Sequence, residues 1–242
     1  MSMIGSQLLR MGARLLRAGL PQDCVLCGAD SDDAPLCVPC LRELPTLGQI
    51  CPTCAMPSTL GEKCGSCLRH PPPFDTTVAV WRYSYPVDRL VQALKFHGRL
   101  ALAPFFAGAL RSVAQRTLAQ CVDIVIPVPL HPERLAERGF NQAAEVARHL
   151  TAGTGAERLR ARLESRAASR VRRTLTQADL PLAARSRNVL GSFACTLNLG
   201  GARVAVVDDV MTTGATLGEL AKVLKRAGAA RVENWVVART FD

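Results

Sequence analysis

The sequence predicts an α/β protein in which a mostly parallel sheet, flanked by helices, follows a small cysteine-rich module. Apolar strand-like runs alternate with helical patterns over residues 74–242, and this alternation is typical of parallel sheets. Eight of the ten cysteines fall within residues 21–73, a segment that ends in three prolines. Apolar residues make up 48% of the 242 residues, which is enough to fill a core, so global disorder is not expected.

Periodicity assigns the elements of residues 74–242 in chain order. A proline in the first turn is compatible with the second of the helices, and the four apolar residues 204–207 indicate a buried strand. The predicted strands cover residues 77–83, 123–128, 202–207 and 231–237, and the predicted helices cover residues 88–96, 104–118, 141–150 and 216–227.

The arginine-rich segment 157–187 has no clear assignment. Arg158, Arg162, Arg166 and Arg170 recur four residues apart, so they would form one basic stripe if the segment were helical. A solvated face or a mobile loop is the simpler interpretation, and a groove for a nucleic-acid backbone is the alternative.

The first 20 residues carry Arg10, Arg14 and Arg17 among leucines, which predicts a short basic amphipathic helix. Its role is packing on the neighbouring domain or, alternatively, binding a membrane surface or a partner. The charges interrupt the apolar residues instead of preceding them, as they would in a secretion signal. No stretch is apolar enough to span a bilayer. We therefore expect a cytoplasmic protein without a transmembrane segment, divided into residues 1–20, 21–73 and 74–242.

The cysteines form four Cys-x-x-Cys pairs, and this spacing lets a tight turn direct both sulfurs at one metal ion. Nine residues separate the first pair from the second and the third from the fourth. Equal spacing favours two sequential four-thiolate ribbons, although a crossed pairing is also compatible with it. Closed four-thiolate sites leave no coordination position for catalysis, so we expect two structural Zn²⁺ ions. The expected ligands are Cys24, Cys27, Cys37 and Cys40 in one ribbon and Cys51, Cys54, Cys64 and Cys67 in the other.

A second motif directly follows the apolar run 204–207. Asp208 and Asp209 come at its carboxyl end, where open α/β sheets bind ligands, and a small hydroxyl-rich turn then opens a helix. Backbone N–H groups of such a turn cradle a phosphate, whereas the two carboxylates suit the hydroxyls of a ribose as hydrogen-bond acceptors. The Gly-Lys-Ser/Thr of a P-loop is missing, which disfavours nucleotide hydrolysis. The expected phosphate-side residues are Val210, Met211, Thr212, Thr213, Gly214, Ala215 and Thr216.

This stretch resembles the phosphoribosyl-pyrophosphate signature of type I phosphoribosyltransferases. Over nearly its full length the chain is similar to the ComF family, competence-associated proteins with a double zinc ribbon and a phosphoribosyltransferase-like domain. Further segments that carry the resemblance are LKFHGR at 94–99, IPVPL at 126–130, RGFNQ at 138–142, Arg173-Thr174 with Gln177, and RNV at 187–189.

The resemblance implies a type I phosphoribosyltransferase fold with a ligand crevice at the carboxyl ends of the strands. It implies that Asp208 and Asp209 hold the ribose hydroxyls, that residues 211–216 hold the 5-phosphate, and that the turn after Val128 faces the pyrophosphate. Arg138, at a helix start, would meet phosphate, while Asn141 would cap the helix. The stretch around residues 172–187 would be the mobile catalytic loop, so Arg173 joins Asp208 and Asp209 as an expected catalytic residue.

Two hypotheses about function follow. In the first, the protein is a phosphoribosyltransferase-like enzyme that binds phosphoribosyl pyrophosphate with Mg²⁺, and a nucleophile displaces pyrophosphate at the anomeric carbon. In the second, the fold is retained without catalysis, and the protein handles single-stranded DNA, together with other DNA-uptake proteins, during natural transformation. The net charge of +10, from 30 basic and 20 acidic residues, favours a polyanionic partner and fits both a phosphorylated ligand and DNA.

Overall fold

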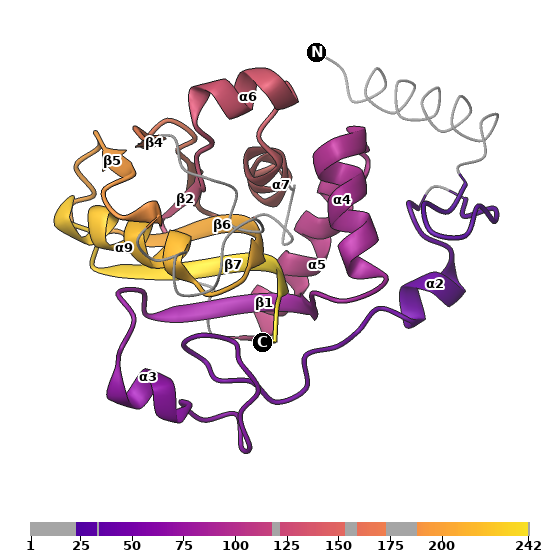
Figure 1. Ribbon diagram of the computed structural model, residues 1–242, viewed down its shortest axis with the longest axis horizontal. Coiled ribbons are helices and arrows are strands. Elements are labelled where there is room, and N and C mark those ends of the chain that lie inside the picture. Colours follow the sequence, from indigo (N-terminus) through magenta and orange to yellow (C-terminus); the bar gives the residue numbers. More distant parts are fainter. Residues whose placement is uncertain (1–22, 33, 118–121, 153–158, 173–187, 242) are drawn as a thin grey trace, which may run out of the picture. The chain divides into compact units, whose positions relative to one another are not determined.

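The computed structural model describes residues 23–32, 34–117, 122–152, 159–172 and 188–241 (Figure 1). The chain divides into two compact units, residues 1–44 and 45–242. The second cysteine ribbon belongs to the same unit as the sheet, whereas the sequence grouped both ribbons within residues 21–73. The predicted basic helix over residues 1–20 lies outside the described residues.

The larger unit contains a five-stranded sheet in which every strand pairing is parallel. The four apolar residues 204–207 are fully buried, as expected for a central strand covered on both faces. The parallel sheet and its flanking helices confirm the predicted α/β class. In spatial order the strands are β1 (Thr76–Arg82), β7 (Arg231–Arg239), β6 (Arg203–Met211), β2 (Ile124–Pro127) and β3 (Arg162–Leu163).

Besides the short helix α3 (Gly65–Arg69), the described part of the larger unit contains five helices, and three of these were predicted almost to the residue. Helix α9 packs Leu217, Leu220 and Leu224 into a core cluster that also contains Val204 and Val206 of β6. Helices α5 and α7 contact each other and the strands of the sheet. Within the described residues, no helix is long and apolar enough to cross a membrane. The helices are α4 (Val87–His97), α5 (Leu102–Arg116), α6 (Pro132–Arg138), α7 (Gln142–Thr151) and α9 (Ala215–Arg226).

The structure differs from the sequence-based prediction around the acid pair. Strand β6 was expected to end at residue 207, but it continues to Met211, so Asp208 and Asp209 lie within the strand, where Asp208 pairs with Val236 of β7. The two acids are therefore held by sheet hydrogen bonding and not by a loop. They are still near the carboxyl end of the strand, as the ligand-site prediction requires.

The basic stripe expected from a helical reading of Arg158, Arg162, Arg166 and Arg170 is wrong for the part that the structure describes. Arg162 lies in β3, and Arg170 lies in β4 (Ala168–Arg170), which pairs antiparallel with β5 (Phe193–Cys195). Arg162 forms an ion pair with Glu164, and the Arg170 guanidinium lies over the Phe193 ring. Arg158 lies outside the described residues. The four-residue spacing of these arginines does not reflect a helix.

Candidate metal centres and ligand site

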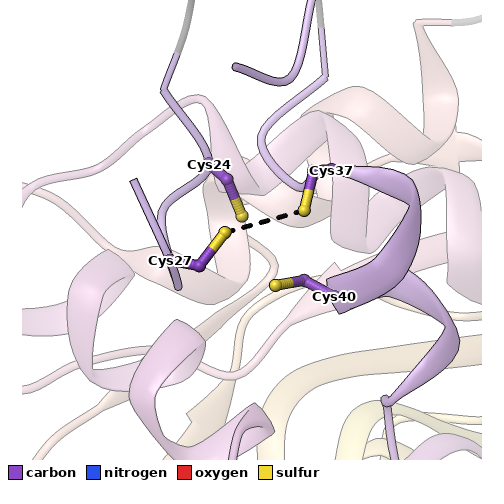
Figure 2. A group of neighbouring side chains, drawn as sticks. All are labelled: Cys24, Cys27, Cys37 and Cys40. Carbon is purple, nitrogen blue, oxygen red and sulfur yellow. Dashed lines mark hydrogen bonds between the residues drawn. The ribbon is translucent and has the colours of Figure 1, made fainter. Parts of the chain in front are cut away.

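The first four cysteines converge in the smaller unit, on a knuckle and on the start of helix α2 (Val38–Arg42) (Figure 2). Their four sulfurs lie within 4.8 Å of one another, and Cys27 Sγ and Cys37 Sγ are 3.7 Å apart. After the knuckle the chain turns through Gly28, whose φ of 72° is a left-handed conformation that glycine adopts without strain. The pairing of neighbouring knuckles is therefore sequential in this ribbon.

The second ribbon repeats this geometry in the larger unit. Its four sulfurs also lie within 4.8 Å of one another, and its last pair sits at the start of helix α3 (Gly65–Arg69). Cys37 and Cys64 occupy the same N-cap position with nearly identical backbone angles. Ala55 follows the knuckle as Gly28 does in the first ribbon, with a φ of 56°. The repeat inferred from cysteine spacing is thus a structural repeat as well.

Both clusters fit a tetrahedral zinc ion. A zinc–sulfur bond of about 2.3 Å places the sulfurs of a tetrahedral site about 3.8 Å apart. The 3.7 Å between Cys27 and Cys37 and the 3.6 Å between Cys54 and Cys64 match this spacing. Burial raises the pKa of the Cys51 thiol, but backbone N–H donors, including that of Cys64 at 3.3 Å, outweigh it and lower the pKa to about 7. Such donors stabilise the thiolate that zinc requires.

The second ribbon is anchored to the edge strand β1. The Thr77 backbone N–H donates to the carbonyl of Pro52 at 3.0 Å, and its hydroxyl donates to the carbonyl of Thr53 at 2.7 Å. The hydroxyl of Thr76 also donates to Pro52. An edge strand exposes unpaired N–H groups, and here the knuckle between Cys51 and Cys54 accepts from one of them, that of Thr77. The ribbon therefore covers the sheet edge.

The acid pair lies on β6, with unequal surroundings. Asp209 is only 4% exposed, Asp208 is half-buried, and the Asp209 backbone N–H donates to the Asp208 carboxylate at 2.9 Å. Burial, reinforced by the neighbouring Asp209 carboxylate, raises the pKa of Asp208 well above its ordinary value. Two adjacent carboxyl groups with divergent pKa values are characteristic of functional sites.

Lys95, at the end of helix α4, forms an ion pair with Asp209. Burial opposes ionisation of Asp209, but the Lys95 ammonium outweighs it and holds the pKa of Asp209 below its ordinary value. Burial also disfavours the charged form of Lys95, yet the carboxylate of Asp209 raises its pKa. From the sequence, Lys95 and His97 could either face a ligand or lie at a solvated helix end; Lys95 pairs with Asp209, while His97 is exposed.

Arg138 and Gln142 extend this network from the RGFNQ string; Arg138, expected at a helix start, is instead the last residue of α6, and Gln142 is the first residue of α7. The Arg138 guanidinium donates to the Gln142 side-chain oxygen at 2.6 Å, and the Gln142 side chain helps to lower the pKa of Asp209. Asn141 caps helix α7, as predicted, by accepting from the N–H groups of Ala143 and Ala144. Its amide nitrogen donates to the carbonyl of Val128 at 3.0 Å, which ties the α7 start to the end of β2. The RGFNQ string thus contacts the end of β2, through Asn141, and Asp209 near the end of β6, through Gln142.

Residues 212–216, hereafter the threonine turn, follow β6 and include the first two residues of helix α9. Gly214 is the N-cap of α9 and has a φ of 78°, and as a glycine it offers no side chain of its own to cap the helix. Thr213 is exposed, and its hydroxyl accepts from the Ala215 N–H at 3.3 Å. The N–H groups at the start of a helix favour an anion. This arrangement has the chemistry expected of a phosphate-binding turn.

Two cavities flank these groups. One, of about 420 Å³, is lined by Lys95, Phe96, Arg134, Arg138 and Phe140, and the Arg138 guanidinium lies over the Phe96 ring. The other, of about 520 Å³, borders the threonine turn at Thr213, Gly214 and Ala215. The first cavity has three basic side chains against one acidic side chain, Glu137, and therefore suits a negatively charged group.

The structure brings most of the predicted ligand residues into the larger unit on adjoining elements. Asp208, Asp209, Val210 and Met211 belong to β6, and Val128 directly follows β2, the neighbouring strand. Arg173 lies outside the described residues, so its role stays a prediction. The sequence did not single out Arg239, a buried arginine on β7 whose side chain donates to the Met211 carbonyl at 3.1 Å.

Comparison with known proteins gives the family. A family model described as a double zinc ribbon domain matches residues 15–68. The chain is 36% identical over 211 residues to the DNA utilization protein YhgH of Escherichia coli strain K12, covering 85% of this chain and 91% of that protein. It is 31% identical over 185 residues to competence protein F of Haemophilus influenzae, covering 74% and 79%. It is 25% identical over 217 residues to competence protein ComFC of Bacillus subtilis, covering 86% and 85%. With two four-cysteine ribbons and relatives of this similarity along most of its length, the chain belongs to the ComF family.

Proposed function

We propose that this protein is a phosphoribosyltransferase-like member of the ComF family that binds phosphoribosyl pyrophosphate and acts in DNA utilisation or competence. The observation that carries the ligand assignment is that the acid pair, Asp208 and Asp209, near the end of central strand β6, is closely followed by the threonine turn. The names of the relatives, a DNA utilization protein and competence proteins, support the cellular role.

The ligand would be recognised at both ends. The threonine turn would receive the 5-phosphate on its N–H groups and hydroxyls, and Asp208 and Asp209 would accept from the two ribose hydroxyls. Arg138 and Lys95 line the cationic cavity and would attract the pyrophosphate. Stabilising the charge on a leaving pyrophosphate is the main chemical demand of displacement at the anomeric carbon.

Magnesium fits this site only together with the ligand. Mg²⁺ prefers oxygen ligands, which the acid pair offers, but Lys95 already pairs with Asp209. The ion would therefore be held chiefly by pyrophosphate oxygens, with Asp208 as the remaining carboxylate. When bound, it would neutralise charge on the leaving group.

Single-stranded DNA is the second candidate ligand. The net charge of +10 favours a polyanion, and one of the relatives is named a DNA utilization protein. Phe96 is 68% exposed beside Arg138, and exposed aromatic rings next to arginines stack nucleic-acid bases. The two candidates are compatible in one protein.

Calorimetry with phosphoribosyl pyrophosphate and Mg²⁺ tests the ligand proposal. Asp208→Asn with Asp209→Asn should weaken binding at least about tenfold, because charge-assisted hydrogen bonds contribute roughly 1.5–3 kcal/mol each. Thr213→Val should also weaken it, through a lost hydroxyl contact. Cys195→Ser, a change on strand β5 outside the acid pair and the turn, is the matched control and should bind as the wild type does.

Ribose 5-phosphate serves as the second titrant. It shares the phosphate and hydroxyls but lacks pyrophosphate, so it should bind more weakly than phosphoribosyl pyrophosphate and lose a similar fraction of affinity in each variant. If the wild type binds neither compound in the presence of Mg²⁺, the ligand assignment is wrong. If folded double variants bind as tightly as the wild type, the roles given to the acids are wrong.

A further inference from the structure

Arg239 lies between the second zinc ribbon and the threonine turn. It is the last residue of strand β7, and it is 5% exposed. Its Nε donates to the backbone carbonyl of Cys54 at 2.9 Å. Its Nη1 donates to the carbonyls of Met211, at 3.1 Å, and of Thr212. One planar guanidinium thus bonds to a zinc-ligand residue and to the chain that leads into the turn.

The partners of Arg239 are backbone atoms at points where the chain leaves regular structure. Met211 is the last residue of β6, where its carbonyl also accepts from the Thr240 N–H at 3.1 Å, and Thr212 opens the turn. Cys54 closes the Cys51–Cys54 knuckle and precedes Ala55, which has a φ of 56°. A rigid fork of donors fixes the relative position of the groups it bridges more strictly than a single ammonium does.

Side-chain packing runs parallel to these hydrogen bonds. The Met211 side chain is buried and approaches Gly214 so closely that a Cβ there would lie 2.7 Å from Met211 Cε. The Thr77 hydroxyl, which donates to the knuckle carbonyl of Thr53, is 4.0 Å from Met211 Sδ. Side-chain contacts therefore run without a break from the knuckle through β1 and Met211 to the turn. Arg239 adds hydrogen bonds between the knuckle and the residues that open the turn.

We propose that Arg239 is a positioning residue that couples the second zinc cluster to the threonine turn, so that an intact ribbon holds the turn in its ligand-binding conformation. The proposal deepens the ligand assignment above and rests on it for its effect on affinity. Its structural part, that the ribbon orders the turn, does not depend on any ligand. Zinc in the second ribbon then supports binding as well as folding, whereas zinc in the first ribbon does not act through Arg239.

The first test uses hydrogen exchange of the full, zinc-loaded chain and needs no ligand. Cys54→Ser and Arg239→Gln should both increase exchange in peptides covering residues 211–220, where the start of α9 depends on the turn. Cys27→Ser, the equivalent change in the first ribbon, should leave these peptides unchanged. Arg82→Gln is the matched arginine control, because Arg82 is the register neighbour of Arg239 on β1 and is exposed. Unchanged exchange in Arg239→Gln would overturn the coupling.

The second test measures ribose 5-phosphate affinity in the same variants, with the zinc content determined for each. Arg239→Gln should weaken binding about tenfold while retaining two zinc ions, since several hydrogen bonds to one charged group are lost. Combining it with Cys54→Ser should weaken binding no further than the stronger single change, because both act through one link. Additive losses would contradict the proposal. If the wild type does not bind ribose 5-phosphate, the ligand assignment fails, while the exchange result still decides the coupling.

If Cys54→Ser unfolds the larger unit, Arg239→Lys still tests the positioning role of Arg239. Lysine keeps the positive charge but cannot reach the carbonyls on both sides with one planar group. We expect this variant to keep two zinc ions and to unfold within a few degrees of the wild type, yet to bind ribose 5-phosphate several-fold more weakly and to exchange faster in residues 211–220. Wild-type affinity together with wild-type exchange in Arg239→Lys would show that charge alone suffices and would overturn the positioning role.

Discussion

The ammonium of Lys95 on helix α4 forms an ion pair with the carboxylate of Asp209 on strand β6. This contact makes Asp209 electrostatically different from its neighbour Asp208. Asp209 is 4% exposed, and the Lys95 side chain is 22% exposed. The Lys95 ammonium compensates the negative charge of Asp209. The pKa of Asp208, by contrast, is raised by burial and by the nearby Asp209 carboxylate. The two acids are therefore expected to respond differently to the same substitution.

Asp209→Asn should lower the free energy of unfolding by about 1–3 kcal/mol, because it leaves the Lys95 ammonium unpaired in a poorly hydrated site. Asp208→Asn should change it little or increase it, because the carboxyl that it removes ionises unfavourably in the folded protein. Urea denaturation at pH 7 measures both. Asp123→Asn, which weakens the exposed pair with Arg203, is the comparison and should cost under about 1 kcal/mol. Equal effects of Asp208→Asn and Asp209→Asn would contradict this difference.

Acid titration of the same variants should show opposite trends. The pKa of Asp209 is lowered in the fold, so its contribution to stability is present above its unfolded pKa of about 3.9 and is lost as the pH falls through the lower folded value. The pKa of Asp208 is raised, so its destabilising effect develops as the pH rises above about 3.9. Unfolding free energies measured across this pH range should therefore show the Asp209→Asn deficit shrinking in acid. A deficit that grows in acid would contradict the assignment.

The sequence predicted those parts of the site whose residues are neighbours in the chain. The cysteine pairs and the run from Asp208 to Thr216 carry their geometry in local spacing, because a knuckle and a strand–turn–helix are both short segments. Sequential pairing of the knuckles, which the spacing favoured without deciding, is confirmed by the two sulfur clusters.

Contacts between elements that are far apart in the sequence could not be predicted from local sequence patterns. Lys95 meets Asp209 only because α4 ends beside the carboxyl end of β6, and the helical period of α4 specifies its buried face, not its neighbour. The bonds of Arg239 to Cys54 and Met211 likewise depend on the order of strands in the sheet. Strands β3 and β4, of two and three residues, are too short to show a period, so their arginines were open to a helical reading.

Zinc content should separate the two ribbons. Elemental analysis should give about two zinc ions per chain, and Cys24→Ser and Cys51→Ser should each leave about one, because each cluster is a closed set of four sulfurs. Cys51→Ser should also destabilise the larger unit, since its ribbon covers β1, whereas Cys24→Ser should not change the unfolding of that unit. Cys195→Ser, outside both clusters, should keep two ions. Loss of both ions from either single variant would indicate shared ligands.

Gly214→Ala should damage the threonine turn more than a comparable glycine change elsewhere. Gly214 has a φ of 78°, and an added Cβ would lie 2.7 Å from Met211 Cε and 3.7 Å from the Phe74 ring. Left-handed strain and a displaced buried methionine together should cost about 1–3 kcal/mol of unfolding free energy. Gly191→Ala is the matched control, because its φ of 64° brings the same strain but its Cβ would meet nothing within 4 Å. Equal losses in thermal or urea unfolding would exclude crowding at the turn.

Binding of single-stranded DNA, if it occurs through the positive charge of the chain, should be tolerant of sequence and steeply dependent on salt. The logarithm of the affinity should fall with the logarithm of the salt concentration with a slope of about −0.7 for each phosphate contacted, because each contact releases counterions. Arg166→Gln, at an exposed position of the arginine-rich segment, should reduce the magnitude of the slope by about 0.7 if it meets a phosphate. Arg203→Gln is the control, since its guanidinium already pairs with Asp123. Fluorescence anisotropy with a labelled oligonucleotide at several salt concentrations measures these slopes. Affinity that does not change with salt, or no binding at low salt, would rule out the DNA role, while the ribose-phosphate measurements would stand independently.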